Sequence, residues 1–261
     1  MVQRRRTADS GLLTLARDLR RRKARERRAL FVAEGVRVVE ELVRSPVEIR
    51  GVVATREAGA SPRGAALLAA LERRGIALKS VSTRDFASAA DTEHPQGVLA
   101  VAREPRHTLE SLAAEARRRL LVLDGIQDPG NVGTLVRTAA ALGAGAVVAL
   151  TGTADLWNAK VVRAAAGAHF HVPTVTCTPD ALVRFLRAHD VPLWGAAAAG
   201  TPLDRLTAPE RVALAVGNEG AGLSAPMRAA ATLMVGLPMA AGVESLNVAV
   251  AAGIILYALR R

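Results

Sequence analysis

In the second half of this chain, the pattern of apolar and polar residues switches regularly between one typical of strands and one typical of helices. From Arg119 onward, short apolar runs are separated by segments in which apolar residues recur at helical spacing. Strands are predicted at 120–123, 146–150, 172–176, 193–198, 212–216 and 233–237, and helices at 134–142, 158–166 and 179–189. Strands that alternate with helices favour an α/β fold with a mostly parallel sheet covered on both faces.

The first hundred residues show a similar but less regular alternation. Helical spacing covers 30–43, a segment from Ser61-Pro62 to Gly75, and 83–90, whereas strands are predicted at 49–55, 76–81 and 98–103. These elements predict a smaller α/β domain. We therefore divide the chain into a basic N-terminal extension (1–28), a first domain (29–106), a linker helix (107–117) and a second domain (118–261).

Charge is concentrated at the N-terminus. The formal net charge is +11, and residues 1–28 hold eleven arginine and lysine side chains against three acids. A basic block of this density indicates an anionic partner, usually nucleic acid, although a solubilising tail has the same composition.

Composition argues against disulfide-bonded, metal-binding and membrane-spanning classes of protein. Cys177 is the single cysteine, which excludes an intramolecular disulfide and a cysteine-rich zinc site. His169 and His171 would share one face of a strand, but without a third ligand nearby they make a poor metal site, so no metal is expected. The longest apolar run, 248–259, is shorter than the ~20 residues of a membrane span. We expect a cytoplasmic protein without a membrane segment.

Three loops after predicted strands carry the candidate chemistry. The first, 124–133, contains three glycines and leads into a helix. Asn131 can cap that helix and Arg137 can reach an anion near its start, but a cap and a solvated arginine explain both residues equally well.

The other two loops lie near the C-terminus. The second reads GNEGAG over 217–222, lacks the order of known phosphate-binding loops, and has Glu219 as its only ionisable group, so alone it is an ordinary turn. In the third, Ser245 or Glu244 is placed to cap the closing helix. Asn247 would then fall in the first turn, where asparagine competes with the backbone.

Taken together, the loops DPGNVGTLVRTA, AVGNEGAGLS and LPMAAGVESLNVAVAAG resemble, in this order, the three signature motifs of the SpoU/TrmH family. These are RNA ribose 2′-O-methyltransferases of the SPOUT superfamily. The resemblance covers 118–261, with Asp128 standing where many members have asparagine. The first domain, with FVAEGVRVVEELV and HPQGVLAVA, is similar to the L30e-like RNA-binding domain that often precedes this catalytic domain.

The resemblance implies a SPOUT domain with a deep trefoil knot, S-adenosylmethionine as cofactor, and a homodimer with the closing helix and first motif at its interface. Arg137 matches the family's catalytic arginine. The other implied catalytic residues are Asn131, Glu219, Ser245 and Asn247, and the implied cofactor-binding residues are Leu214, Val216, Gly217, Asn218, Gly222, Leu237, Pro238, Met239 and Leu246.

The implied reaction is methyl transfer to a ribose 2′-hydroxyl of structured RNA. Because a guanidinium with a pKa above ~12 hardly deprotonates, we expect Arg137 to position the adjacent phosphate and to stabilise the developing alkoxide. We expect 23S rRNA as substrate first and tRNA second. The alternatives are a catalytically silent RNA-binding or ribosome-assembly protein and, more remotely, a nucleotide-cofactor oxidoreductase, whose fingerprint is absent.

Overall fold

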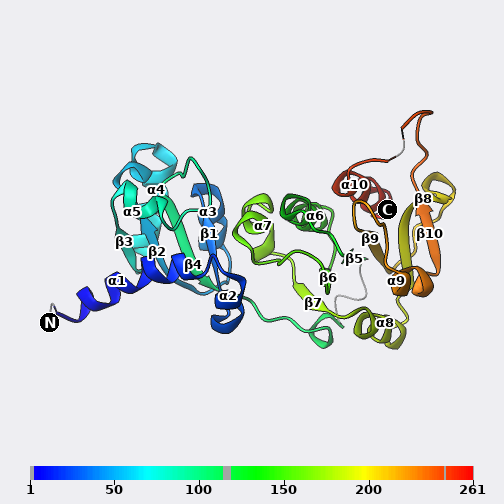
Figure 1. Cartoon of the computed structure of the whole chain (residues 1–261), viewed down its shortest axis with the longest axis horizontal. Coiled ribbons are helices and arrows are strands. Elements are labelled where there is room, and N and C mark those ends of the chain that lie inside the picture. The colour runs from blue at the N-terminus through cyan, green and yellow to red at the C-terminus, as the bar shows by residue number, and fades with distance from the viewer. Residues whose placement is uncertain (1–2, 114–118, 244, 261) are drawn as a thin grey trace. The chain divides into compact units, whose positions relative to one another are not determined.

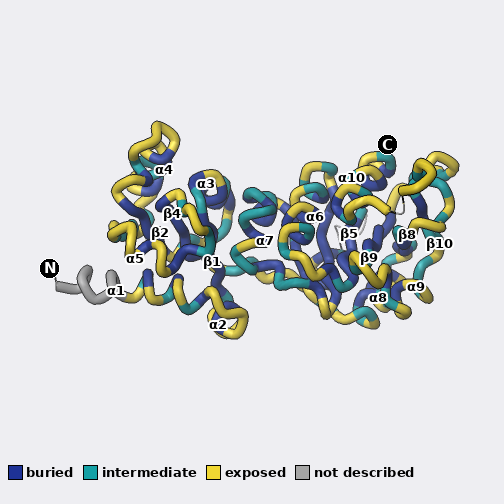
Figure 2. The backbone as a smooth tube through the Cα atoms, turned by 45° about the horizontal axis from the view of Figure 1, so that its top comes forward, coloured by how far each residue is buried: buried dark blue, intermediate teal, exposed yellow. Residues whose placement is uncertain are grey.

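The computed structural model describes residues 3–113, 119–243 and 245–260, which form two compact units (Figure 1). The first unit contains Met1–Pro105 and Trp157–Phe170. The second contains Arg106–Leu156 and His171–Arg261. In each unit a sheet of buried strands is flanked by helices that expose their outer sides (Figure 2).

The first unit is built on a four-stranded sheet of order β1-β4-β2-β3. Its strands are β1 (Leu30–Glu34), β2 (Ile49–Ala54), β3 (Leu78–Ser80) and β4 (Val98–Arg103). β4 is antiparallel to both β1 and β2, whereas β2 and β3 are parallel. Every residue of β1 is buried, which explains why this strand is apolar without alternation.

Helices formed by residues 3–105 flank this sheet. They are α1 (Gln3–Asp18), α2 (Arg22–Arg28), α3 (Val36–Arg44), α4 (Pro62–Arg73) and α5 (Thr83–Ala87), with a 3-10 turn η1 at Arg56–Ala60. The start of α4 is confirmed, because the Ser61 hydroxyl accepts a 3.0 Å hydrogen bond from the Gly64 amide and Pro62 occupies the first turn. α1 contributes Leu13 and Ala16 to the core of the unit, and Leu19, directly after the helix, adds to it.

The predicted helix over 30–43 is wrong in its first part. Residues 30–34 form β1, and α3 begins only at Val36. The apolar spacing fits either structure, but pairing of Phe31 with Ala102 across the sheet buries the segment as a strand. Gly35, with φ of +100°, then turns the chain into the helix, a conformation that glycine adopts at little cost.

The segment Trp157–Phe170 packs within the first unit although it separates two strands of the second. It holds α7 (Ala159–Ala164), capped by Asn158, and a 3-10 turn η4 (Ala168–Phe170). Phe31 packs against Trp157 and Phe170, with ring centroids 4.6 and 5.8 Å away. The predicted pairing of His169 and His171 on one strand face is wrong, because His169 lies in η4 and β7 begins only at Thr174.

The second unit is built on a six-stranded sheet of order β10-β8-β9-β5-β6-β7, and every neighbouring pair is parallel. Its strands are β5 (Arg119–Asp124), β6 (Ala146–Leu150), β7 (Thr174–Cys177), β8 (Leu193–Pro202), β9 (Val212–Gly217) and β10 (Leu233–Gly236). The predicted parallel α/β fold is therefore confirmed. β5, β6 and β7 extend the sheet in one direction and the later strands extend it in the other, so the strand order reverses between β5 and β9.

The helices of the second unit are α6 (Pro129–Ala141), α8 (Pro179–Ala188), α9 (Ala225–Ala230) and α10 (Val248–Leu259), with 3-10 turns η2 (Glu110–Leu112) and η5 (Leu203–Arg205). Thr178 caps α8 as predicted. Residues 107–113 of the predicted linker helix show only the turn η2, and 114–117 lie outside the described residues. Within the described ranges, no helix is both long enough and apolar enough to cross a bilayer.

Candidate active site

The three candidate loops follow the carboxyl ends of β5, β9 and β10 in the second unit. Because these strands are parallel, their carboxyl ends lie at the same edge of the sheet. Loops at such an edge form a ligand crevice where the strand order reverses, and here the reversal falls between β5 and β9. The fold therefore brings together loops of which the first and third are more than a hundred residues apart in sequence.

The loop after β9 closes on itself through its backbone. The amides of Asn218 and Gly222 each donate to the other's carbonyl at 3.0 and 2.9 Å. The Asn218 side chain accepts from the amides of Gly220 and Ala221 and donates to the Gly125 carbonyl at 2.9 Å. A Cβ on Gly217 would lie 2.2 Å from the Gly222 carbonyl carbon, so this turn requires glycine at 217.

The loop after β5 is held by two aspartates that sequence reasoning left without a role. Asp128 caps α6, since its carboxylate accepts from the Asn131 amide at 2.7 Å. The predicted cap at Asn131 is therefore wrong, and α6 begins earlier than expected. Asp124, buried at the end of β5, accepts from the Ser224 amide at 2.6 Å and so joins this loop to the start of α9.

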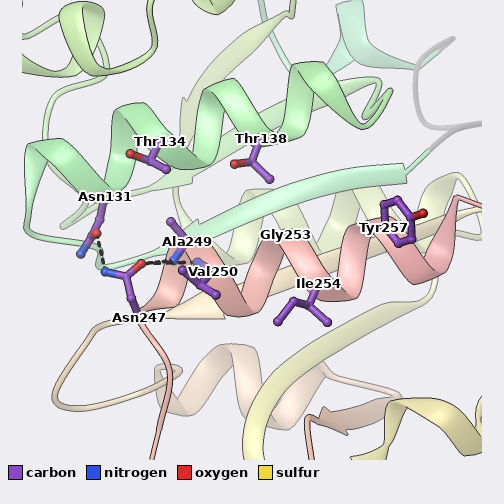
Figure 3. A pocket seen from close by; sticks show the side chains of 9 residues that line it. All are labelled: Asn131, Thr134, Thr138, Asn247, Ala249, Val250, Gly253, Ile254 and Tyr257. Carbon is purple, nitrogen blue, oxygen red and sulfur yellow. Dashed lines mark hydrogen bonds between the residues drawn. The ribbon is translucent and has the colours of Figure 1, made fainter.

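A chain of side-chain hydrogen bonds links all three loops. The Asn131 amide group donates to the Glu219 carboxylate at 2.9 Å, and the Asn247 amide group donates to the Asn131 carbonyl oxygen at 2.9 Å (Figure 3). The Asn247 carbonyl oxygen in turn accepts from the Ala249 amide. Asn247 is thus the cap of α10, which corrects the expectation of a cap at Ser245; Glu244 lies outside the described residues.

Glu219 is the one carboxylate in this chain of bonds. Burial works to raise its pKa, but the hydrogen bond from Asn131 and those from backbone amides, Gln127 among them, stabilise the carboxylate more and lower its pKa below 4.5. Glu219 is therefore ionised at neutral pH. It serves as a hydrogen-bond acceptor and contributes a negative charge beside the loop.

The loops enclose a cavity of about 450 Å³, within the range of small-molecule sites. Ten of the predicted site residues line it: Val216, Gly217, Asn218, Glu219, Gly222, Leu237, Met239, Ser245, Leu246 and Asn247. This lining combines apolar side chains with exposed backbone groups. It suits a ligand with an apolar body and a few polar edges, such as a nucleoside.

One wall of the cavity was not predicted. β8 pairs with β10 at Gly195 opposite Met234, and pairing resumes at Thr201 opposite Val235, so five residues of β8 lie outside the ladder. Three of them, Ala196, Ala197 and Ala198, line the cavity, as do Val235, Val248, Ala251 and Ile255. A run of alanines carries no chemical signal in a sequence, and only the interrupted register shows that these residues face the cavity.

Four predicted residues do not line this cavity. Asn131 is not on the lining but forms hydrogen bonds to Glu219 and Asn247, which are. Leu214 is fully buried in β9, in register with Leu121 and Trp194. Pro238 lines a neighbouring cavity. Arg137 is exposed on α6. The roles of Leu214, Pro238 and Arg137 as site residues therefore stay predictions.

A second, more open groove of about 590 Å³ runs between α6 and α10 (Figure 3). Asn131 and Asn247 form one end of it, where it meets the chain of hydrogen bonds. Thr134 and Thr138 line the α6 side. On the α10 side, Val250, Ile254 and Tyr257 are 50, 44 and 47% exposed, an unusual concentration of large apolar surface.

Comparison with known proteins assigns this arrangement to a class. The SpoU rRNA Methylase family matches residues 118–257, and the MRM3-like substrate binding domain matches residues 14–100. The chain belongs to the SpoU rRNA methylase family. Structures of this family contain S-adenosylmethionine, and the Gly217 turn and apolar cavity fit it as cofactor.

Individual relatives match over most of the chain. The 23S rRNA (guanosine(2553)-2′-O)-methyltransferase RlmP of Bacillus subtilis is 38% identical over 93% of both chains. The 23S rRNA (adenosine(1067)-2′-O)-methyltransferase of Streptomyces laurentii is 34% identical over 73% of this chain and 72% of its own. The structure of the SpoU methyltransferase AviRb from Streptomyces viridochromogenes with AdoMet has a TM-score of 0.84 and 26% identity, covering 95% of this chain and 96% of AviRb.

Proposed function

We propose that this protein transfers the methyl group of S-adenosylmethionine to a ribose 2′-hydroxyl of 23S rRNA in the cytoplasm. The observation that carries the proposal is the hydrogen-bonded chain Glu219–Asn131–Asn247, which joins three separate loops at the edge of the cavity. A silent RNA-binding protein would have no need of this chain. The Bacillus subtilis and Streptomyces laurentii relatives, both named as 23S rRNA 2′-O-methyltransferases, support the choice of substrate.

The sulfonium of the cofactor supplies an activated methyl group with a neutral leaving group, so we expect no metal. The protein's task is to hold the weakly nucleophilic hydroxyl in line with that methyl. Backbone groups at Val216, Gly217 and Leu237 would hold the cofactor, and Leu214 would support this wall from behind. Ser245 and Asn247, which line the cavity, would orient the ribose.

Arg137 is assigned to the phosphate next to the reacting ribose. A guanidinium there would fix the nucleotide and stabilise the alkoxide as the proton leaves. Because Arg137 does not line the cavity of its own chain, we propose that it serves the cavity of a second copy. Arg137→Ala should lower kcat by about 100-fold or more, and Arg137→Lys should restore little of it. Near-full activity of the lysine variant would contradict a planar, bidentate role.

The apolar groove between α6 and α10 supports the proposal of a second copy. We propose a homodimer in which Val250, Ile254 and Tyr257 of α10 are covered by the partner. Ile254→Glu would bury a carboxylate in this contact, so the variant should elute as a monomer in light-scattering chromatography and lose activity. Ala229→Glu on the exposed side of α9 is the matched control and should remain a dimer. A wild-type monomer with full activity would contradict the shared site.

The trefoil knot stays a prediction. Its support is the close approach of β8 and β10, where a Cβ on Gly200 would lie 2.4 Å from the Val235 carbonyl carbon.

The function is tested by incubating the protein with labelled S-adenosylmethionine and, separately, unmodified 23S rRNA and tRNA. Mass spectrometry then maps any 2′-O-methyl group, starting with the guanosine equivalent to the RlmP target. We expect transfer to 23S rRNA and activity that EDTA does not change. Transfer only to tRNA would show that tRNA, not 23S rRNA, is the substrate. Cofactor binding without transfer to any RNA would favour a catalytically silent RNA-binding protein.

A further inference from the structure

The N-terminal arginines form an ordered corner of the first unit, which we call the α1–α2 corner (residues 17–28). Residues 20–28 contain seven basic side chains and one acid. The sequence alone is compatible with a loose solubilising tail. In the structure, however, the segment lies in two helices and is packed against the sheet (Figure 1).

The corner is closed by a buried arginine. Arg25 is only 4% exposed, and its guanidinium donates to the carbonyls of Leu19 and Arg20 at 2.7 and 2.9 Å. These carbonyls lie just after the end of α1, where backbone acceptors lack helical partners. Leu19 and Ala24 are buried on either side of the turn. A charged group is costly to bury, so its position here indicates that the geometry of the corner is specified.

The outward side of the corner is rich in positive charge. Arg20, Arg21, Lys23 and Arg27 are exposed, and the Arg21 and Arg27 side chains retain 81 and 70% of their accessible surface. Asp18 faces three guanidinium groups, those of Arg21, Arg27 and Arg28, at 3.8, 3.7 and 3.3 Å. One carboxylate cannot balance three cations, and the excess favours an added anion.

We propose that the α1–α2 corner is a preformed docking surface for the phosphate backbone of the RNA substrate, with Arg25 as its positioning residue. This inference rests on the proposed function. Phosphate contacts add affinity and salt dependence without reading sequence, so the corner would set how tightly RNA binds and leave the methyl-transfer step unchanged.

A lipid surface fits the corner less well. Binding at a bilayer interface needs apolar side chains to insert beside the basic ones. Among the described residues, the exposed large apolar side chains are Val243, Leu246, Val250, Ile254 and Tyr257, all in the second unit. The corner offers charge alone, which suits a polyanion in water.

The test compares two sets of four substitutions. The corner variant carries Arg20→Gln, Arg21→Gln, Lys23→Gln and Arg27→Gln. The control carries Arg56→Gln, Arg73→Gln, Arg74→Gln and Arg84→Gln, which remove the same charge from other exposed positions of the first unit. Both proteins are assayed for RNA affinity by filter binding across a salt series, for KM and kcat, and for cofactor affinity.

We expect the corner variant to reduce the slope of log affinity against log salt by about 3, as the loss of roughly four phosphate contacts requires. Its KM for rRNA should rise at least about tenfold at 0.15 M salt, with kcat at saturating RNA and cofactor affinity unchanged. The control should change KM by less than about threefold. Equal effects in the two variants would overturn the proposal, because bulk charge would then explain both.

Arg25→Met tests the positioning role, since it leaves every exposed charge in place. RNA affinity should fall while the thermal unfolding temperature of the whole chain shows the protein still folded, and Arg25→Lys should restore part of the affinity. Unchanged RNA affinity in a folded Arg25→Met protein would show that Arg25 does not position the corner.

Failure of the proposed function can be told apart from failure of the docking proposal, because filter binding needs no turnover. If the wild-type protein methylates no RNA but binds RNA more tightly than the corner variant does, only the proposed function is refuted. Wild-type binding to phosphatidylserine vesicles that the corner variant loses, with RNA affinity intact, would overturn the RNA assignment.

Discussion

The α1–α2 corner and the cavity of the second unit present opposite kinds of chemical group to a ligand. The corner presents exposed arginine and lysine side chains that point into solvent, and its backbone is turned inward and capped by Arg25. The cavity presents backbone, glycines and small apolar side chains, and among the described residues that line it Glu219 is the only ionisable one. The first suits a long, uniformly charged polymer, and the second suits one small molecule held in one orientation.

This difference separates two demands on an RNA-modifying enzyme. Affinity for RNA can come from many weak, salt-dependent contacts that tolerate small errors in position. Methyl transfer needs the reacting atoms held within a few tenths of an ångström, which rigid backbone contacts supply better than flexible side chains. Substitutions in the two regions should therefore affect different measured quantities, and the predictions below test that separation.

The largest effect is expected at Gly217. Gly217→Ala places a Cβ within 2.4 Å of three backbone atoms of Gly222 and Leu223, so the turn must move. Overpacking of about 3 kcal/mol corresponds to roughly 100-fold weaker cofactor binding, measured by calorimetry. RNA affinity should stay within about twofold of wild type, because the corner is untouched.

Gly220→Ala is the matched control, since the nearest atom to its Cβ would be Asn218 Oδ1 at an ordinary 3.7 Å. This variant should bind the cofactor normally. A Gly217→Ala protein with normal cofactor affinity would show that the turn is more adaptable than its packing indicates.

Asn131 should give the next largest effect. Asn131→Ala removes hydrogen bonds to Glu219 and Asn247 and so uncouples the three loops. A hydrogen bond to a charged group contributes about 1.5–3 kcal/mol, so kcat should fall by roughly 10- to 100-fold in a single-turnover assay. Asn158→Ala, which removes an asparagine that caps α7 in the first unit, is the control and should keep near-normal kcat. A fall in RNA affinity instead of kcat would break the proposed separation between the two regions.

Much of this site could be predicted from the sequence because its loops carry unusual residues at the ends of apolar runs. Glycines at 217 and 222 and the polar residues 131, 219 and 247 stand out against an alanine- and valine-rich background. The parallel fold then places such loops at one edge without further information. The predicted parallel sheet and smaller first domain were confirmed for the same reason, since regular alternation of strand and helix admits few other folds.

The unpredicted features depend on register and tertiary packing. The wall at Ala196–Ala198 exists because β8 leaves its ladder with β10 for five residues, which alanines do not signal. The cap of α10 falls on Asn247, not on Ser245, because Asn131 holds the Asn247 side chain from another loop. Likewise, residues 30–34 have helical spacing but form β1, since long-range pairing with β4 outweighs local preference.

Acid should weaken cofactor binding at the cavity but not RNA binding at the corner, and only below the pH range in which Glu219 is ionised. The depressed pKa of Glu219 means that the stabilising contribution of its carboxylate is present above 4.5 and is lost only as pH falls below it. Arginines do not titrate in this range. Wild-type cofactor affinity and RNA affinity should therefore both stay level between pH 8 and about 5.

Asn131→Ala removes the strongest hydrogen bond that opposes the effect of burial on Glu219, so the pKa of Glu219 should rise. The loss of cofactor affinity should then begin at higher pH than in wild type, with a difference of a few-fold near pH ~5, while RNA affinity stays level. Glu219→Gln is the control, because it cannot titrate and should show no such step. A step that persists in Glu219→Gln would assign the titration to another group.

The smallest effect is expected at Cys177, which lies at the end of β7 and belongs to neither ligand surface. Burial raises the pKa of its thiol to about 11, so the reactive thiolate is scarce at pH 8. Cys177→Ser should change kcat and both affinities by less than about twofold. Iodoacetamide should label the folded protein far more slowly than the protein in denaturant, followed by intact mass. Rapid labelling that also lowers kcat would show that modification at the end of β7 affects the cavity. It would then contradict the statement that Cys177 belongs to neither ligand surface.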